Sequence, residues 1–143
     1  MIEGGLDRPG QNHILKNIVA SGGKTVFITP VVAFNSTSPA HRTWTEIDLS
    51  AIIPVGAIGV LASITLNDSG TDNFLTIDKN GRKSFLSLIV YVASEMSYSN
   101  SNSGAVECDA DRKIGYYVSR GGAGSVNQCS VFISGYVIPV AQR

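Results

Sequence analysis

The sequence predicts an all-β protein built as a two-sheet antiparallel sandwich, and three features of the chain support this. Apolar residues fall into short runs separated by Gly, Ser, Asn and Asp, the pattern of strands joined by turns. Several runs are apolar on both faces, so both faces of those strands must be covered. No long stretch has helical spacing, and we therefore expect a second sheet or another subunit to cover the second face.

The segment at residues 1–23 differs from the rest of the chain. Glycine pairs and a Pro-Gly step bracket a short apolar stretch whose spacing fits one helix or an extended arm lying along a neighbour. The stretch holds Ile14, Leu15, Ile18 and Val19. We expect 1–23 to be an N-terminal connector or arm, and 24–143 to form the β-sandwich domain.

Eight strands are predicted from Lys24 onward. We expect them at 25–34, 42–49, 57–67, 74–78, 82–93, 105–109, 113–119 and 129–140. Larger apolar side chains alternate with mostly smaller residues at 57–66, which indicates a core strand whose outer face lies close to another part of the structure. Eight strands are enough for two facing sheets.

The strand predicted at 82–93 contains the clearest run with two apolar faces. Phe85, Ile89 and Tyr91 fall on one face because successive side chains of a strand point to opposite sides. The other face carries Leu86, Leu88, Val90 and Val92. We expect these four to be partly buried between subunits, which predicts an oligomer.

The turns follow from glycine and small polar residues. Asn80-Gly81 predicts a type I′ hairpin between the strands at 74–78 and 82–93. Polar or glycine-rich segments at 68–73, 97–104 and 121–124 are predicted as loops, and we expect any ligand contacts there.

Composition and charge exclude several classes of partner. Charged residues make up 15% of the chain and hydrophobic residues 43%, which fits a large interface. Eleven basic and eleven acidic residues cancel without a basic cluster, so we expect no nucleic-acid binding. The sequence shows no signal peptide and no apolar run long enough for a membrane span, and we expect no membrane insertion.

Residues with catalytic or metal-binding chemistry form no recognisable motif. His13 and His41 have no Cys, Asp or Glu at metal-ligand spacing. Asp109 and Asp111 would share a face of an extended chain and could bind Ca²⁺ or act as an acid–base pair, but a strand-end turn is the plainer interpretation. We predict no metal, no cofactor and no catalytic residue.

The two cysteines leave two interpretations open. Cys108 and Cys129 could form one disulfide if their strands pair, or remain as two small buried thiols. Their separation matches no metal or redox motif.

Aromatic and amide side chains are the candidates for ligand contact. Trp44 shares one face with Glu46 and Asp48, so its ring could stack on a sugar beside hydroxyl acceptors, or serve as a structural Trp. Tyr98 lies in a segment rich in Ser and Asn, the composition of adaptable recognition loops. The predicted ligand-binding residues are Tyr98, Asn100, Asn102, Arg112 and Arg120.

Three stretches together resemble the C-terminal β-domains of bacteriophage tail fibres and tailspikes. They are Trp-Thr-Glu-Ile-Asp-Leu-Ser at 44–50 with Ile-Pro-Val-Gly-Ala at 53–57, Arg-Lys-Ile-Gly-Tyr-Tyr-Val at 112–118, and Ile-Ser-Gly-Tyr-Val at 133–137. The resemblance spans about residues 42–140. It implies a homotrimer at the distal end of a fibre in the virion tail, which locks three chains together and contacts host surface glycans.

We therefore expect a jelly-roll type sandwich that assembles as a homotrimer for host attachment, with host surface polysaccharide as its ligand. Three weak sites on one rigid axis would act together on a repeated polysaccharide. A purely structural trimerisation clamp is the first alternative. A polysaccharide-processing enzyme using Asp109 and Asp111 is the second, although the repeat of a tailspike β-helix is absent from the sequence.

Overall fold

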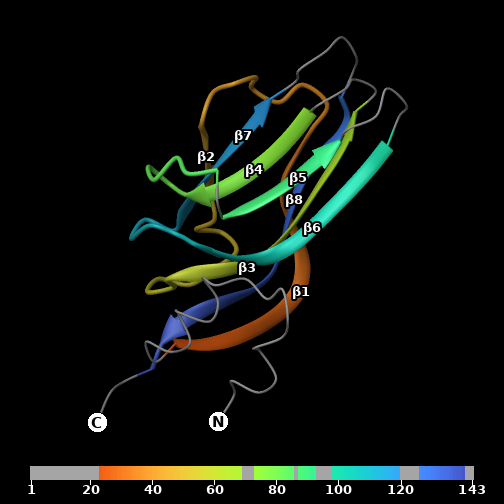
Figure 1. Ribbon diagram of the computed structural model, residues 1–143. Coiled ribbons are helices and arrows are strands. Elements are labelled where there is room, and N and C mark those ends of the chain that lie inside the picture. Colours follow the sequence, from red (N-terminus) through yellow and green to blue (C-terminus); the bar gives the residue numbers. More distant parts are fainter. Residues whose placement is uncertain (1–22, 69–72, 86, 93–97, 120–125, 141–143) are drawn as a thin grey trace.

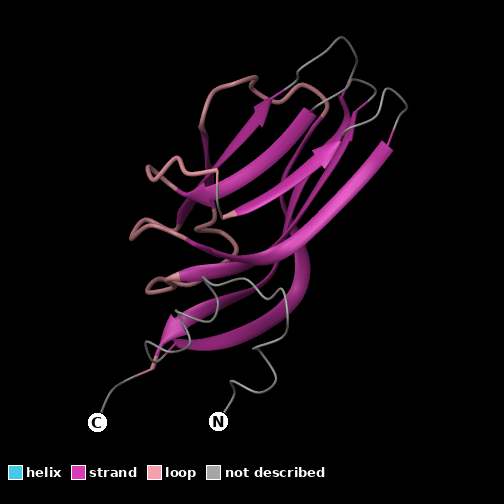
Figure 2. Ribbon diagram, viewed as in Figure 1, coloured by secondary structure: helices cyan, strands magenta, loops and turns pink. Residues whose placement is uncertain are grey.

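The protein is built from strands alone in the part of the chain that the structure describes. The structure is a computed structural model, and it describes residues 23–68, 73–85, 87–92, 98–119 and 126–140. Two antiparallel sheets of four strands each face one another, with no helix in these ranges (Figures 1 and 2). The predicted all-β class and the pair of antiparallel sheets are confirmed.

The strands alternate between the two sheets along most of the chain. They are β1 (Gly23–Ser36), β2 (Thr45–Asp48), β3 (Gly59–Asp68), β4 (Asn73–Lys79), β5 (Leu88–Val92), β6 (Tyr98–Glu107), β7 (Lys113–Ser119) and β8 (Val126–Pro139). The first sheet has the order β1-β8-β3-β6 and the second the order β2-β7-β4-β5. Only β4 and β5 are both consecutive in sequence and neighbours in one sheet.

The core lies between the facing sides of the two sheets. Alternate residues of β3 are buried, as a strand with one covered face requires. The largest fully buried side chains are Leu49, Ile64, Leu66, Leu75, Ile77, Ile114, Ile133, Val60, Val92, Val106, Val118 and Val131. Each such burial contributes about 1.5–3 kcal/mol of hydrophobic stabilisation, so this one cluster holds the sheets together.

The strand predicted at 82–93 is shorter, and the type I′ hairpin prediction is wrong. The described residues between β4 and β5 form a loop, and β5 starts only at Leu88. Gly81 has a φ of 86° but Asn80 does not have a positive φ, whereas a type I′ turn requires both. The amide of Arg82 instead donates to the carbonyl of Lys79 at the start of this longer β4–β5 loop.

The prediction of a polar loop at 97–104 is also wrong, because its described residues, 98–104, belong to β6. It pairs with β3 along its whole length, from Tyr98 opposite Asp68 to Glu107 opposite Gly59. Hydroxyl groups pair across the two strands, as in the hydrogen bond of 2.8 Å between Thr65 and Ser101. These cross-strand bonds let a sequence rich in Ser and Asn form a strand.

The apolar residues expected between subunits lie inside the single chain. Leu88, Val90 and Val92 are 4%, 5% and 0% exposed and face the core between the two sheets. This corrects the interpretation that they are partly buried by another copy. Leu86 lies outside the described residues.

Several other expectations concern the chain ends, thiols and membrane spans. Residues 1–22, predicted as part of a connector or arm, lie outside the described residues, and β1 begins at Gly23. Cys108 and Cys129 are free and buried, so they form no disulfide. The described part of the chain holds no helix long and apolar enough to cross a bilayer.

Candidate functional site

Five aromatic side chains gather on the outward side of the second sheet, and we call this surface the aromatic face. Its members are Trp44, Phe74, Phe85, Tyr91 and Tyr117. They come from the residue before β2, from β4, from the β4–β5 loop, from β5 and from β7. Segments distant in the sequence therefore build one surface, because the strand order places them side by side.

The rings of the aromatic face contact one another as a continuous set. The centroid of Tyr117 lies 5.4 Å from that of Trp44 and 5.0 Å from that of Phe85. Phe74 extends the set to Tyr91 at 5.7 Å. These separations are in the range of favourable aromatic pairs, so the rings hold one another in place.

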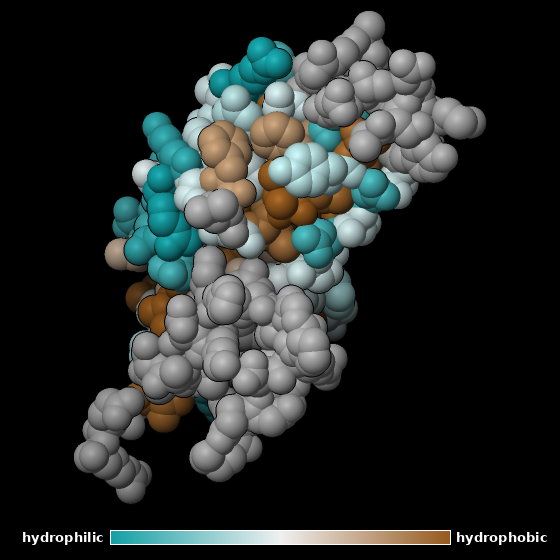
Figure 3. Space-filling view, viewed as in Figure 1, coloured by the Kyte–Doolittle hydropathy of each residue, from teal (hydrophilic) through white to brown (hydrophobic). Residues whose placement is uncertain are grey.

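The aromatic face remains accessible to solvent. Phe85 is 45% exposed and Tyr91 is 58% exposed. Figure 3 shows hydrophobic atoms gathered over β4 and β5 with hydrophilic side chains around them. Exposed apolar surface with a polar rim is typical of an interaction site.

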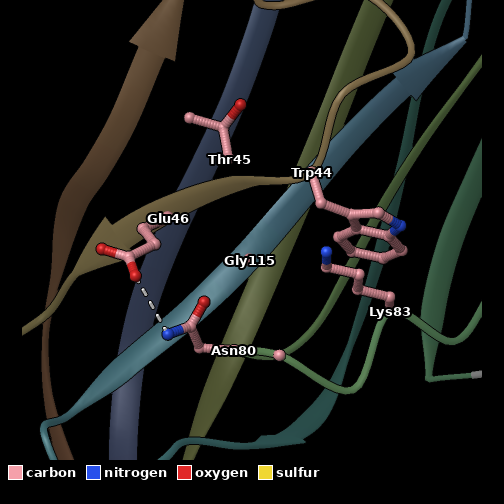
Figure 4. A pocket seen from close by; sticks show the side chains of 7 residues that line it. Trp44, Thr45, Glu46, Asn80, Lys83 and Gly115 are labelled. Atoms are coloured by element: carbon pink, nitrogen blue, oxygen red, sulfur yellow. Dashed lines mark hydrogen bonds between the residues drawn. The ribbon is translucent and has the colours of Figure 1, made fainter.

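A pocket of about 310 Å³ lies at one end of the aromatic face, beside Trp44 (Figure 4). It is lined by Trp44, Thr45, Glu46, Asn80, Gly81, Lys83 and Gly115. Gly115 lines the pocket next to Trp44, and a Cβ atom there would lie 3.3 Å from Cε3 of the indole ring. The absence of a side chain at this position lets the indole ring lie close to β7.

Acidic side chains line and flank the polar side of the pocket. Glu46 accepts hydrogen bonds from Asn80 at 3.3 Å and from Nζ of Lys113 at 3.2 Å. The Asn80 amide also donates to Asp109 at 3.0 Å. The hydrogen bond that Lys113 donates to Glu46 is the main cause that raises the pKa of Lys113, which stays charged at neutral pH.

The carboxylate of Asp78 fixes the β4–β5 loop, which carries the pocket residues Asn80 and Lys83. It accepts hydrogen bonds from Nε of Arg82 at 2.8 Å, from the amide of Ser84 at 2.8 Å, from the hydroxyl of Ser87, and from the amide of Lys79 at the end of β4. Burial alone would raise the pKa of Asp78, but these hydrogen bonds outweigh it and hold the pKa below its ordinary value. An ionised, buried carboxylate thus anchors one wall of the site.

Asp109 and Asp111 occupy a turn at the end of β6. One Asp109 oxygen accepts the amides of Asp111 at 3.0 Å and Lys113 at 2.8 Å. Burial opposes ionisation of Asp109, but hydrogen bonds from Asn80 and from these amides lower its pKa overall. The arrangement is that of a strand-end turn, and the described residues contain no cluster of His, Cys, Asp and Glu able to hold a metal ion.

Three of the predicted ligand-binding residues bond to the protein's own backbone. Asn100 and Asn102 donate to the carbonyls of Tyr91 and Ile89, which ties β6 of the first sheet to β5 of the second. Arg112 donates to the carbonyls of Ser50 and Ile53, each at 3.1 Å. None of these residues lines the pocket beside Trp44.

The other two predicted residues lie outside what the structure describes: the side chain of Tyr98, and Arg120 as a whole. The backbone of Tyr98 opens β6. The predicted contact residues therefore remain a prediction, and the structure adds a site that the sequence indicated only through Trp44 and Glu46. Tyr117 and Phe74 carried no signal of their own, because their position beside Trp44 depends on the strand order.

No family model matches this chain, and no curated protein matches it either. The geometry alone describes what the site offers. It combines apolar ring faces, ionised acceptors and an amide in one shallow surface, which suits a ligand with both apolar C–H faces and hydroxyl groups.

Proposed function

We propose that this chain is the distal domain of a viral tail fibre or tailspike that trimerises and binds host surface polysaccharide. In this proposal the sandwich is of jelly-roll type. The strand order β1-β8-β3-β6 and β2-β7-β4-β5 supports this, because the chain crosses repeatedly between two four-stranded sheets. Jelly rolls of eight strands are common in viral capsid and lectin domains.

The observation that carries the proposal is the aromatic face with its adjoining pocket. A pyranose ring has an apolar face of C–H groups that packs on an aromatic ring, and its hydroxyl groups donate to carboxylates. Trp44 supplies the ring, and Glu46 and Asn80 supply polar partners within the same pocket. A shallow site of this kind binds weakly, and three copies on one axis would raise its apparent affinity for a repeating polymer.

The edge strand β1 supports assembly with other copies. Phe27, Val31 and Val32 on this strand are 71%, 40% and 51% exposed. A long apolar edge is a surface that associates with another chain unless it is protected. Pro30 lies within the register shift between Phe27 and Val31, which interrupts the ladder, so we propose contact through side chains rather than strand addition.

Binding to a glycan array tests the recognition part of the proposal. We expect the Trp44→Ala variant to bind a host polysaccharide roughly ten-fold more weakly, since it loses about 1–2 kcal/mol of ring stacking. Trp44→Phe should retain most of the affinity, and Val55→Ala, at an exposed position outside the pocket, should retain all of it. Tyr98→Ala tests the contact residue predicted from the sequence in the same assay.

A structural trimerisation clamp is the second candidate function, because the apolar residues of β1 account for assembly without any ligand. Light scattering and the array separate the two candidates. A trimer that binds no polysaccharide would leave the clamp as the function, and a stable monomer would overturn both.

A further inference from the structure

Lys83 differs from the other cations around the pocket because its ammonium has no carboxylate partner among the described residues. Lys113 pairs with Glu46 at 3.2 Å, and Arg82 pairs with Asp78 at 2.7 Å. Lys79 lies 3.9 Å from Glu107. Lys83 lines the pocket, is exposed, and forms no ion pair within the described ranges.

Hydrogen bonds made by the two flanking residues hold Lys83 in this position. Its neighbours Arg82 and Ser84 both donate to the buried carboxylate of Asp78. Lys83 itself adopts a φ of 56°, in the left-handed region that side chains rarely occupy. Figure 4 shows its side chain on the same side of the pocket as the Trp44 ring, away from the hydrogen bond between Glu46 and Asn80.

The charges that line the pocket leave one positive group uncompensated. Among the described residues that line it, Glu46 and Lys83 are the ionisable ones, and the negative charge of Glu46 is offset by Lys113. An anion that enters beside Trp44 would therefore meet Lys83, while Glu46 and Asn80 would meet hydroxyl groups. A lysine ammonium acts as a point charge and pairs with carboxylate or phosphate alike.

We infer, on the basis of the proposed function, that the glycan recognised here is acidic. Its sugar ring packs on Trp44, and an anionic substituent of the same or the next residue pairs with Lys83. This assigns Lys83 as the residue that distinguishes acidic from neutral polysaccharides. The full chain then selects polymers by charge as well as by ring stacking.

The test measures binding of the full chain to four immobilised polymers: a uronate-containing polysaccharide, the same polymer with its carboxylates reduced to alcohols, a phosphodiester-linked polysaccharide, and neutral dextran. We expect binding to one or both acidic polymers, and at least five-fold weaker binding to the carboxyl-reduced form if uronate is the ligand. Binding to the acidic polymers should also weaken as salt concentration rises. The two acidic arms distinguish carboxylate from phosphate.

Variants at Lys83 assign the effect to this side chain. Lys83→Gln should weaken acidic binding roughly five-fold, and Lys83→Arg should restore most of it. Lys79→Gln removes the same charge from a neighbouring position that does not line the pocket, and should leave binding unchanged.

The outcomes separate this inference from the proposed function. Binding to neutral dextran or to the carboxyl-reduced polymer as strong as to both acidic polymers, or no effect of Lys83→Gln on acidic binding, would overturn the acidic inference while a loss in Trp44→Ala still supported the glycan site. Binding to no polysaccharide in these arms or in the array would overturn both.

Discussion

Asp78 is the residue on which the shape of the pocket depends most directly. It is fully buried, yet it lies on the strand next to an exposed loop and gathers the hydrogen bonds of that loop. A buried carboxylate is stable only when it is paired and hydrogen-bonded, and Arg82 meets both conditions at 2.7 Å. From the sequence, Asp78 is only the last residue of the strand predicted at 74–78. Its role could not be predicted because Arg82 and Ser84, which bond to it, fall in the segment 82–93 that was expected to be a strand.

Acidification is expected to weaken the fold partly through Asp78. Its pKa in the folded state lies below the ordinary value of 3.8, so its contribution to stability is present above that value and is lost as pH falls through the folded pKa. Asp78→Asn should cost about 1–3 kcal/mol at about pH 7 and less at about pH 3, below the ordinary pKa. Urea denaturation at both pH values measures this.

Asp111→Asn is the control for the acid experiment, because Asp111 is exposed and its side chain anchors no loop in the described structure. It should change stability little at either pH. An Asp78→Asn protein as stable as the parent at neutral pH would show that the carboxylate does not hold the β4–β5 loop.

Gly115 is the second residue with a specific effect on the site. Gly115→Ala places a Cβ atom 3.3 Å from the Trp44 ring, so the ring must shift by a few tenths of an ångström. We expect weaker polysaccharide binding, roughly three-fold or more, with a stability change below about 1 kcal/mol. Titration followed by tryptophan fluorescence measures the binding, since Trp44 is the only tryptophan.

Gly135→Ala serves as a comparison, because we expect it to lower stability and to leave polysaccharide binding unchanged. A Cβ atom there would lie 2.8 Å from the backbone oxygen of Val26 in the first sheet, which cannot move as a side chain can. This variant should lose stability by about 1–3 kcal/mol while any folded protein binds normally. Unchanged binding in Gly115→Ala would show that the ring position does not matter for the ligand.

At the scale of elements, strand prediction succeeded where side-chain alternation and core burial agreed. β7 spans the predicted residues 113–119 because Ile114, Tyr116 and Val118 face the core in strict alternation. The same reasoning placed β3 and β8 within a few residues. Alternation is a local property, so one sequence is enough to detect it.

Prediction failed where partners on other strands decide the conformation. Residues 98–104 are predicted as a loop because Ser and Asn favour turns. In the structure they belong to β6, and their side chains form hydrogen bonds with β3 and β5. Phe85 is predicted to lie in a strand, but it lies in the β4–β5 loop and its ring contacts those of Trp44 and Tyr117. These contacts depend on the strand order, which the sequence alone did not determine.

The apolar residues of β1 give a prediction at the same scale. Phe27→Ser combined with Val32→Ser should convert the proposed trimer to a monomer, because burial of these two exposed apolar side chains would no longer stabilise the interface. Light scattering after size-exclusion chromatography measures the mass. Each monomer should keep its fold, since neither residue belongs to the core cluster.

Phe85→Ser is the matched control for the assembly experiment. It removes an exposed phenylalanine of the aromatic face, in the β4–β5 loop, and should leave the proposed trimer intact while it reduces polysaccharide binding. A trimer that persisted in the β1 double variant would place the subunit contact elsewhere.

For the whole molecule, one shared core accounts for the behaviour of both cysteines. Cys129 is fully buried opposite Leu66, and burial raises the pKa of its thiol to about 12. Burial likewise raises the pKa of Cys108 to about 11. Both side chains therefore remain protonated and enclosed at neutral pH.

Thiol labelling tests whether the core behaves as a single unit. In the native protein at about pH 7.5, a disulfide reagent should react with neither cysteine over hours, and in denaturant both should react. If both thiols become reactive at the same denaturant concentration, the two sheets unfold together. Rapid labelling of either thiol in the native protein would contradict the closed core.

The pairing of β1 with β8 has a consequence for the synthesis of the protein. Gly23 lies opposite Pro139, so the earliest described strand obtains its sheet neighbour only when the latest one has been made. At roughly 5–20 amino acids per second, synthesis of the roughly 100 residues between the end of β1 at Ser36 and the end of β8 at Pro139 takes about 5–20 s. During that interval the nascent β1 lacks its sheet neighbour, and its unpaired edge needs protection from other chains.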